Sequence, residues 1–354
     1  MKLIDIPKRI RNLRNQKRLA LLRFIRRIVL KIVDIRISKQ TEIQYINQDV
    51  FNSRVISVKK IENSTNIKNQ QSKDIFEHNF NAKYLVTLSN VIVNTESGFV
   101  YAIDKYEKYF LISESTEWPT DRAIIYSENP PFKIKHKIKF GALGLPNSSF
   151  AHLMSEDLPN LLRIKSRNNI LFYMKSNSLN HQIFDVCKFK KNTVPKWVHV
   201  SKLEMVTKGK DVGYLHPENL KLIRQFKNTI VFESNKKSKE KYYISRINFT
   251  RSSKFELKIQ EYFKKLGFKI VYPEKLSLIE QVKLFSNAKV IAGIHGGGIF
   301  HSVWSDSCDV IELMPKSRLN RCFEWQTFIR GSKYLGTAID NSEINFTDIK
   351  RLVS

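Results

Sequence analysis

The residues best suited to chemistry lie in the stretch GIHGGGIFHSVW, where His295 is followed directly by Gly296, Gly297 and Gly298. The chain has only 12 glycines in 354 residues, and three of them stand in this row. Glycine lets another group approach the main chain closely. Apolar residues before the loop and an ordered pattern after it predict a strand that ends there and a helix that begins there. We expect the amides at that helix start to bind a phosphate group.

A tight turn from strand to helix is the alternative interpretation of this loop, although no single tight turn needs three glycines. Two known phosphate-binding patterns do not match it. The dinucleotide-binding pattern needs a third glycine where this chain has His301, and the phosphate loop of nucleotide hydrolases needs a Gly-Lys-Ser/Thr sequence that does not follow. The chain also has no Asp-x-Asp pair that could hold a nucleotide sugar through a metal ion.

Strands and helices alternate around the glycine loop. The pattern predicts strands at YYISR, FKIVYP, KVIAGI and DVIELMP. The first helix between them is expected to be capped by Ser252 or Ser253 and stopped by Gly267, and the second to begin with a capping box of Ser277 and Glu280. This alternation predicts a parallel sheet with helices on both faces, and such sheets bind ligands beyond the carboxyl ends of their strands.

The upstream half is less regular. The segment YLVTLSNVIVNTESGFVYAID predicts a pair of strands that turn at ESG. The segment SSFAHLMSEDLPNLLRI is typical of a helix in which Pro159 marks a kink or a break. This helix carries three titratable side chains close together: His152, Glu156 and Asp157.

The charge of the chain indicates an anionic partner. Its 61 Lys or Arg residues against 33 Asp or Glu residues give a net charge of +28, which suits a phosphate-bearing substrate, an anionic lipid or a nucleic acid. Residues 1–40 alone hold 13 Lys or Arg and two Asp. They predict a basic amphipathic helix on an anionic membrane surface, too polar to span it, or else a helix packed on the chain's own core. Three cysteines without paired spacing argue against a disulfide framework or a zinc site.

The order of motifs resembles glycosyltransferase family 61, most strongly between residues 242 and 315. Members of that family carry an Ile-Ser-Arg strand, a Gly-Phe-x-Val-x-x-Pro-Glu-x-Leu-Ser connection, a Glu-Gln-Val-x-Leu-Phe helix, a His-Gly-Ala-Gly loop and a strand ending in Ile-Glu-Leu. Each has a counterpart here in the same order, with Gly297 in place of the alanine. The upstream FAHLMSEDLPNLL is similar to the family's His-x-x-x-Asp/Glu-x-Leu-Pro segment, so the resemblance covers roughly residues 85–333.

The resemblance implies an α/β fold of the GT-B type, in which two Rossmann-like domains face a cleft, here after an N-terminal amphipathic helix. Residues 1–40 would be the membrane-surface helix, 41–210 the acceptor-binding domain, 211–333 the nucleotide-sugar-binding domain and 334–354 a C-terminal tail. The implied activity is that of an inverting hexosyl- or pentosyltransferase that needs no metal. Its donor would be a nucleotide sugar, expected to be UDP-linked, and its acceptor a glycan or a lipid-linked glycan.

Donor-binding roles are implied for seven residues: His295, Gly296, Gly297, Gly298, Glu312, Arg246 and Arg251. The loop would hold the diphosphate, Glu312 the ribose hydroxyls and the two arginines phosphate oxygens. An inverting transfer also needs a base, and Glu156, His152 and Asp157 are the candidates. Ordinary surface or buried polar roles are the alternative for each. The chain departs from the family pattern at Asn160, often an arginine, and at His301, often an asparagine.

The expected setting is a bacterial enzyme of capsular polysaccharide or lipopolysaccharide synthesis, cytoplasmic and peripheral on the inner face of the cell membrane. Two other function classes remain open on the sequence. One is a relative that binds a nucleotide sugar without transferring it. The other is a basic nucleic-acid-binding protein, which is disfavoured because the charge is concentrated at the N-terminus and no nucleic-acid-binding motif occurs.

Overall fold

A computed structural model describes residues 55–62, 65–69, 76–80, 83–103, 109–112, 128, 130–131, 133–208, 213–231, 240–247, 249, 253–316 and 320–339. Residues 48–354 form one compact unit. The helix predicted within residues 1–40 and the side chain of Arg251 lie outside the described residues. None of the described helices is long and apolar enough to cross a membrane.

The first half of the described chain builds a mixed sheet. Its strands, with a separate hairpin formed by β2 and β3, are β1 (Val55–Glu62), β2 (Thr65–Asn69), β3 (Phe76–Phe80), β4 (Lys83–Asn94), β5 (Phe99–Ile103), β6 (Tyr109–Leu111), β7 (Lys137–Ile138), β8 (Gly141–Ala142), β9 (Ile170–Tyr173), β10 (Lys191–Val194) and β11 (Trp197–Val206). The main order is β10-β9-β8-β11-β4-β5-β6. Strands β10, β9, β8 and β11 run parallel, whereas β11, β4, β5 and β6 pair antiparallel. The strand pair predicted to turn at ESG is confirmed, because β4 and β5 pair antiparallel on either side of this turn. The antiparallel strands make this half differ from the Rossmann-like domain that the resemblance implies.

The helices of this half follow β8, β9 and β11. They are α4 (Phe150–His152), a π-helix η2 (Leu153–Asp157), α5 (Leu158–Arg163), α6 (Ser178–Cys187) and α7 (Pro217–Asn228). Asn180 on α6 donates through its side-chain amide to the carbonyl oxygens of Leu145 and Pro146, at 3.4 and 3.2 Å. This contact anchors the loop that leads into α4.

The second half confirms the predicted parallel sheet. Its elements are β12 (Glu240–Ile244), α8 (Glu256–Lys265), β13 (Lys269–Val271), η3 (Pro273–Lys275), α9 (Leu278–Ser286), β14 (Ala288–Ile294), the 3-10 helix η4 (Gly297–Trp304), β15 (Asp309–Pro315), α10 (Cys322–Ile329) and β16 (Tyr334–Ile339). The strands lie in the order β13-β12-β14-β15-β16, and every pairing is parallel. The sheet thus extends beyond residue 333, because residues 334–339, predicted as the start of a tail, pair with β15.

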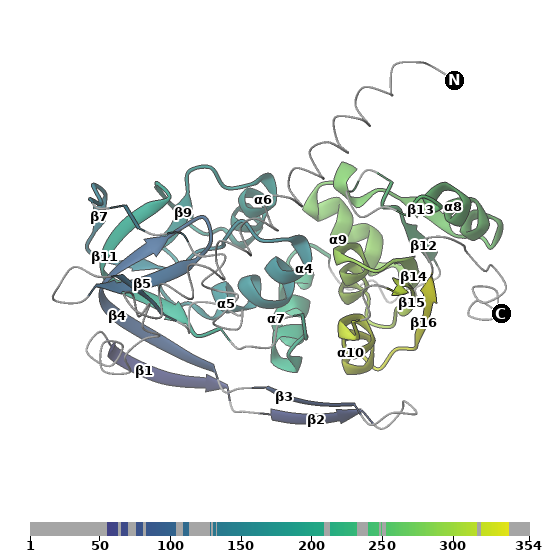
Figure 1. Cartoon of the computed structure of the whole chain (residues 1–354), viewed down its shortest axis with the longest axis horizontal. Helices are drawn as coiled ribbons and strands as arrows, with labels where there is room; N and C mark the ends of the chain where they lie inside the picture. Colours follow the sequence, from purple (N-terminus) through teal and green to yellow (C-terminus); the bar gives the residue numbers. More distant parts are fainter. Residues whose placement is uncertain are drawn as a thin grey trace, which may run out of the picture. The chain divides into compact units, whose positions relative to one another are not determined.

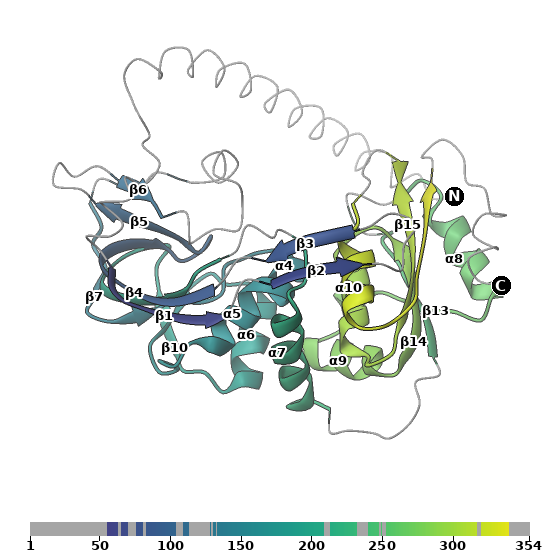
Figure 2. The ribbon, with the colours of Figure 1, turned by 90° about the horizontal axis from the view of Figure 1, so that it is seen from below.

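Helices cover both faces of this parallel sheet. Figure 1 and Figure 2 show α9 and α10 on the face toward α7, with α8 on the opposite face. The α8 face is closed by a cluster that includes Tyr243, Ile259 and Phe263. The cluster on the other face continues into the first half, from Phe285 and Trp304 to Leu153. The two halves therefore share one hydrophobic core.

Local signals set most helix ends. Ser277 and Glu280 form the predicted capping box at the start of α9. Gly267 ends α8 with a φ of +81°, a conformation that glycine adopts without strain. The predicted cap at Ser252 or Ser253 is wrong, because α8 begins later and its N-cap is Phe255. The Ser253 hydroxyl instead accepts from the amide of Phe255 in a short turn.

Pro159 reshapes the helix that carries Glu156 rather than ending it. Proline has no N–H, so Pro159 cannot donate to the carbonyl of Ser155, four residues earlier. The turn before it widens, and the amide of Leu158 bonds to the carbonyl of Leu153, five residues back. The side-chain amide of Asn219 on α7 donates to the Ser155 carbonyl at 2.7 Å. Asn219 thus supplies the donor that proline lacks and stabilises the π-turn around Glu156.

Removing the Asn219 side chain should destabilise the fold by an amount that depends on Pro159. Asn219→Ala leaves the buried Ser155 carbonyl without this donor, which costs about 1–3 kcal/mol. In a Pro159→Ala background the restored N–H can donate to the same carbonyl, so the second substitution should cost clearly less. Urea denaturation of the four proteins in this cycle measures both values. Equal costs in the two backgrounds would show that Asn219 does not replace the proline's missing donor.

Candidate functional site

The glycine loop lies at the topological switch point of the parallel sheet. From β12 the chain passes through α8 to β13 on one side, and then through α9 to β14 on the other side. The carboxyl ends of β12 and β14 are therefore adjacent, and ligands of open α/β sheets bind at such a point. Ser245 and Arg246 follow β12, and His295 and the glycine loop follow β14.

The surroundings leave no room for a side chain at two of the three glycines. Gly296 has φ +156°, and a Cβ there would lie 2.0 Å from a guanidinium nitrogen of Arg246. A Cβ at Gly298 would lie 2.7 Å from a methyl group of Ile244, so this glycine allows η4 to pack on β12. A Cβ at Gly297 would make ordinary contacts of 3.6–3.7 Å with Ala151. Alanine therefore fits at this one position, in keeping with the alanine of the similar family motif.

His295 is held on several sides. Its Nδ1 lies 2.6 Å from Oε1 of Glu312, and its amide donates to the carbonyl of Leu313 at 2.9 Å. Its carbonyl accepts a hydrogen bond from the Arg246 guanidinium. The ring lies edge-on to Phe323, with 5.6 Å between ring centroids. The loop thus starts from a residue whose main chain and ring are both fixed.

Arg246 is also positioned by a buried carboxylate, that of Glu256. Its amide donates to Oε1 of Glu256 at 2.9 Å, and the hydroxyl of Tyr243 donates to the same oxygen at 3.1 Å. Glu256 is 2% exposed, and burial raises the pKa of its carboxyl group. The guanidinium lies beside Gly296, at the open end of the sheet where a phosphate would approach.

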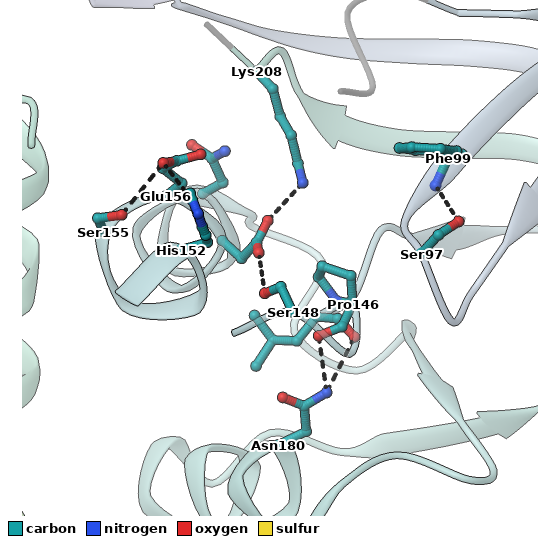
Figure 3. Close-up of polar contacts among 12 residues, drawn as sticks. Ser97, Phe99, Pro146, Ser148, His152, Ser155, Glu156, Asn180 and Lys208 are labelled. Carbon is teal, nitrogen blue, oxygen red and sulfur yellow. Dashed lines mark hydrogen bonds and ion pairs between the residues drawn. The ribbon is translucent and has the colours of Figure 1, made fainter. Parts of the chain in front are cut away.

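A second polar cluster surrounds Glu156 on the π-turn. Its Oε1 accepts from the amide of Gly213 at 3.2 Å and lies 3.4 Å from both the Ser155 hydroxyl and Nδ1 of His152. Figure 3 shows the side chains of His152 and Ser155 converging on Glu156. The His152 side chain is 28% exposed and that of Glu156 is 11% exposed. The pair is therefore accessible mainly through His152.

Asp157 occupies a different environment. Its Oδ1 accepts from Nζ of Lys208 at 2.6 Å, and its Oδ2 accepts from the Ser148 hydroxyl at 2.9 Å, as drawn in Figure 3. The side chains of Asp157 and Lys208 are only 3% and 9% exposed. This buried, paired carboxylate joins the loop before α4 to the end of β11, which is a structural contact.

The two clusters meet where α4 packs on η4. A Cβ placed on Gly297 would lie 3.6 Å from that of Ala151, the residue before His152, and the rings of Phe150 and Phe300 cross edge to face at 6.2 Å. His301 also joins this contact, because its ring stacks on Phe285 with 4.5 Å between centroids and lies 4.3 Å from the Phe150 ring. His301 therefore serves the core beneath the loop, not its open side. Burial lowers the pKa of His301 to about 3, so it is neutral at physiological pH.

The structure brings most predicted site residues together but gives Glu312 a different environment from the predicted one, and it also places Asn160, one of the two departures from the family pattern. Glu312 has no exposed surface, and its oxygens accept from His295 and Tyr334, so its carboxylate does not face a ribose as predicted. Asn160 is buried, and its Oδ1 accepts from Lys83 at 3.4 Å. Within the described ranges, no group of three or more His, Cys, Asp or Glu side chains is placed to hold a metal ion.

Sequence reasoning missed the supporting side chains of Tyr334, Glu256, Lys208 and Asn219. Only Tyr334 left a signal, because the run YLGTAI after a Gly-Ser turn has the composition of a strand. Lys208 and Asn219 act through contacts with residues 51 and 64 positions away, and Glu256 through contacts with residues 10 and 13 positions away. No local pattern marks any of the three.

A comparison of the sequence with models of known protein families finds a family that matches the part of the chain carrying this site. Residues 150–316 match the family model of Glycosyltransferase 61. The match begins at α4 and ends after β15, so it contains both the His152–Glu156 pair and the glycine loop. No curated protein sequence matches the chain. Residues 150–316 are therefore a glycosyltransferase family 61 domain, and this domain identifies the protein as a glycosyltransferase.

Proposed function

We propose that this glycosyltransferase is an inverting enzyme of the GT-B type that moves a sugar from a UDP-linked donor to a glycan or lipid-linked acceptor, without a required metal ion. The observation that carries the proposal is that the glycine loop lies beside α4, where a Cβ placed on Gly297 would lie 3.6 Å from the Cβ of Ala151. This proximity joins a loop suited to bind a diphosphate to a helix that carries a proton-accepting pair. A transfer reaction needs these two functions within reach of one substrate.

The donor half of the proposal rests on the start of η4. The amides of Gly297 and Gly298 open this helix, and no earlier turn offers them a carbonyl acceptor. Arg246 lies beside Gly296, and His295 begins the loop. As the bond from the sugar to the diphosphate breaks, negative charge grows on the leaving nucleoside diphosphate. Donors already fixed around that position stabilise the charge without reorganising.

The acceptor half assigns the base to the His152–Glu156 pair. The acceptor oxygen attacks the anomeric carbon from the face opposite the diphosphate, the bond to the diphosphate breaks, and the acceptor's proton passes to the base. Glu156 is the proposed base, and His152, as the more exposed member, is the other candidate. Asp157 is assigned a structural role, because its carboxylate is already paired with Lys208.

Substitutions on the π-turn should separate chemistry from stability. Glu156→Gln should bind UDP as the parent does but lower the rate of transfer by roughly 10²–10⁴-fold, the usual contribution of a positioned base. Asp157→Asn, the matched control on the next residue, should instead lower the melting temperature, because it removes the carboxylate charge that is paired with the buried Lys208. A screen of UDP-, GDP-, CMP- and dTDP-sugars first identifies the donor for the turnover assay. Calorimetry with UDP and thermal unfolding complete the set.

Two results would contradict this assignment. Unchanged turnover in both Glu156→Gln and His152→Gln would exclude the pair as the base. A parent protein that binds UDP but transfers no sugar from any of the donors to glycan or lipid-linked acceptors would instead support a non-catalytic binding role.

The proposed setting is the inner face of a bacterial cell membrane, where the enzyme would take part in capsular polysaccharide or lipopolysaccharide synthesis. Support comes from the charge of residues 1–40, since a basic amphipathic helix binds anionic headgroups.

Deleting residues 1–40 should release the protein from vesicles that contain anionic lipid, because most of the local positive charge is removed, while UDP binding remains. Co-sedimentation of the full and shortened chains in moderate salt measures this, with neutral vesicles as the control. A shortened chain that still sediments with anionic vesicles would place the membrane contact elsewhere.

A further inference from the structure

The last strand of the parallel sheet brings a tyrosine to the carboxylate that holds His295. The hydroxyl of Tyr334 donates to Oε2 of Glu312 at 2.7 Å, while Oε1 lies 2.6 Å from Nδ1 of His295. Glu312 has no exposed surface. Strand β16, which begins at Tyr334, lies beyond the segment 150–316 that matches the family.

Gly336 makes room for this arrangement. In the sheet register, Glu312 pairs with Gly293 on one side and with Gly336 on the other. A Cβ at Gly336 would lie 2.7 Å from the Tyr334 hydroxyl oxygen and 2.8 Å from a ring carbon. A side chain at position 336 would therefore prevent the Tyr334 side chain from extending along β16 to Glu312. The contact is built into the sheet and is not a chance surface pairing.

The hydrogen-bond pattern fixes the state of the His295 ring. An ionised carboxylate accepts hydrogen bonds and cannot donate them. Burial and the Glu312 charge raise the pKa of Tyr334, so its hydroxyl keeps its proton and remains a donor. Nδ1 of His295 must then carry a hydrogen in order to bond the other oxygen. Nε2 is left facing away from Glu312, with no hydrogen-bond partner among the described residues.

We propose that Glu312 and Tyr334 are positioning residues that fix the tautomer and orientation of His295, so that Nε2 faces the diphosphate of the donor. This inference rests on the donor role proposed for the glycine loop. When Nε2 also carries a hydrogen, the ring is a cation, and the Glu312 carboxylate beside Nδ1 neutralises its positive charge. The ring then makes a charge-assisted hydrogen bond to the leaving diphosphate.

Tyr334 holds Glu312 in the orientation that His295 needs. Without the hydroxyl, Oε2 would be buried without this donor, and the carboxylate would gain by rotating away from His295. A group that supports a binding residue usually acts by orienting that residue, as the groups hydrogen-bonded to metal ligands do.

Imidazole nitrogen NMR tests the tautomer in the protein without ligand. With ¹⁵N-labelled histidine, the eight histidines give separate ring signals, and a His295→Gln variant identifies those of His295. We expect a hydrogen on Nδ1 of His295 in the parent protein, and we expect UDP to shift the Nε2 signal. A parent protein in which Nδ1 carries no hydrogen would overturn the proposal, even if UDP binds.

Tyr334→Phe tests the role of the hydroxyl. It should loosen the Nδ1 hydrogen bond, so that this hydrogen exchanges faster with water, and weaken UDP binding by roughly ten-fold or more, the scale for a hydrogen bond to a charged group. Tyr242→Phe is the matched control, because it removes a tyrosine hydroxyl from the same sheet and should leave both measurements near the parent values.

An unchanged His295 signal and unchanged UDP affinity in Tyr334→Phe would contradict the positioning role. If this variant does not fold, the ring signals of the parent protein still decide the proposal. Failure of the parent protein to bind UDP would count against the proposed donor site itself, whereas the tautomer without ligand is measured independently.

Discussion

The rest of the site depends on how the neutral ring of His301 packs between the helices. It is 2% exposed, stacks on Phe285 of α9 and lies against Phe150 of α4, while Nε1 of Trp304 donates to its Nδ1 at 3.2 Å. These contacts connect η4, which begins with the glycine loop, to the helix that carries His152. Because burial strongly disfavours a charged ring here, packing rather than ion pairing maintains the contact.

A buried carboxylate supports each of the two site residues, His295 and Arg246, that follow the switch-point strands β14 and β12. Glu312 holds the ring of His295, and Glu256 holds the amide of Arg246. Each buried carboxylate also accepts a tyrosine hydroxyl from the sheet, Tyr334 in one case and Tyr243 in the other. Buried carboxylates are costly unless they are hydrogen-bonded, and these bonds keep the loop and the arginine rigid. A rigid site suits a reaction in which charge develops on a departing diphosphate.

The sequence was informative where the signal is local or periodic. Alternating apolar segments predicted the parallel sheet from β12 to β15, and Ser277 with Glu280 predicted the start of α9. The glycine row correctly marked the carboxyl end of β14. The β4–β5 hairpin of the first sheet was predicted from its local turn, but the pairing of β11 with β4 and β8 was not, because it joins strands that are far apart in the chain. The environment of Glu312 was missed for the same reason, since Tyr334 meets it only once β16 has joined the sheet.

Pro159 shows how a correct local signal can have an unexpected outcome. The expected break became a π-turn, because Asn219 on a distant helix supplies the missing donor. Asp157 stands next to Glu156 in sequence, yet it is buried against Lys208 while Glu156 faces His152. The wider turn determines that Asp157 contacts Lys208 while Glu156 contacts His152. The spacing of these residues in the sequence could not reveal this arrangement.

The central claim is that main-chain amides of the glycine loop hold the donor's diphosphate, and a glycine-selective NMR titration tests it most directly. With ¹⁵N-labelled glycine, the 12 glycines give a spectrum simple enough to assign by single substitutions. We expect UDP to shift the amide signals of Gly297 and Gly298 more than those of distant glycines such as Gly267, and we expect uridine without phosphate not to do so. If UDP binds with clear shifts elsewhere while the signals of Gly297 and Gly298 stay in place, the loop is only a turn and the account is contradicted.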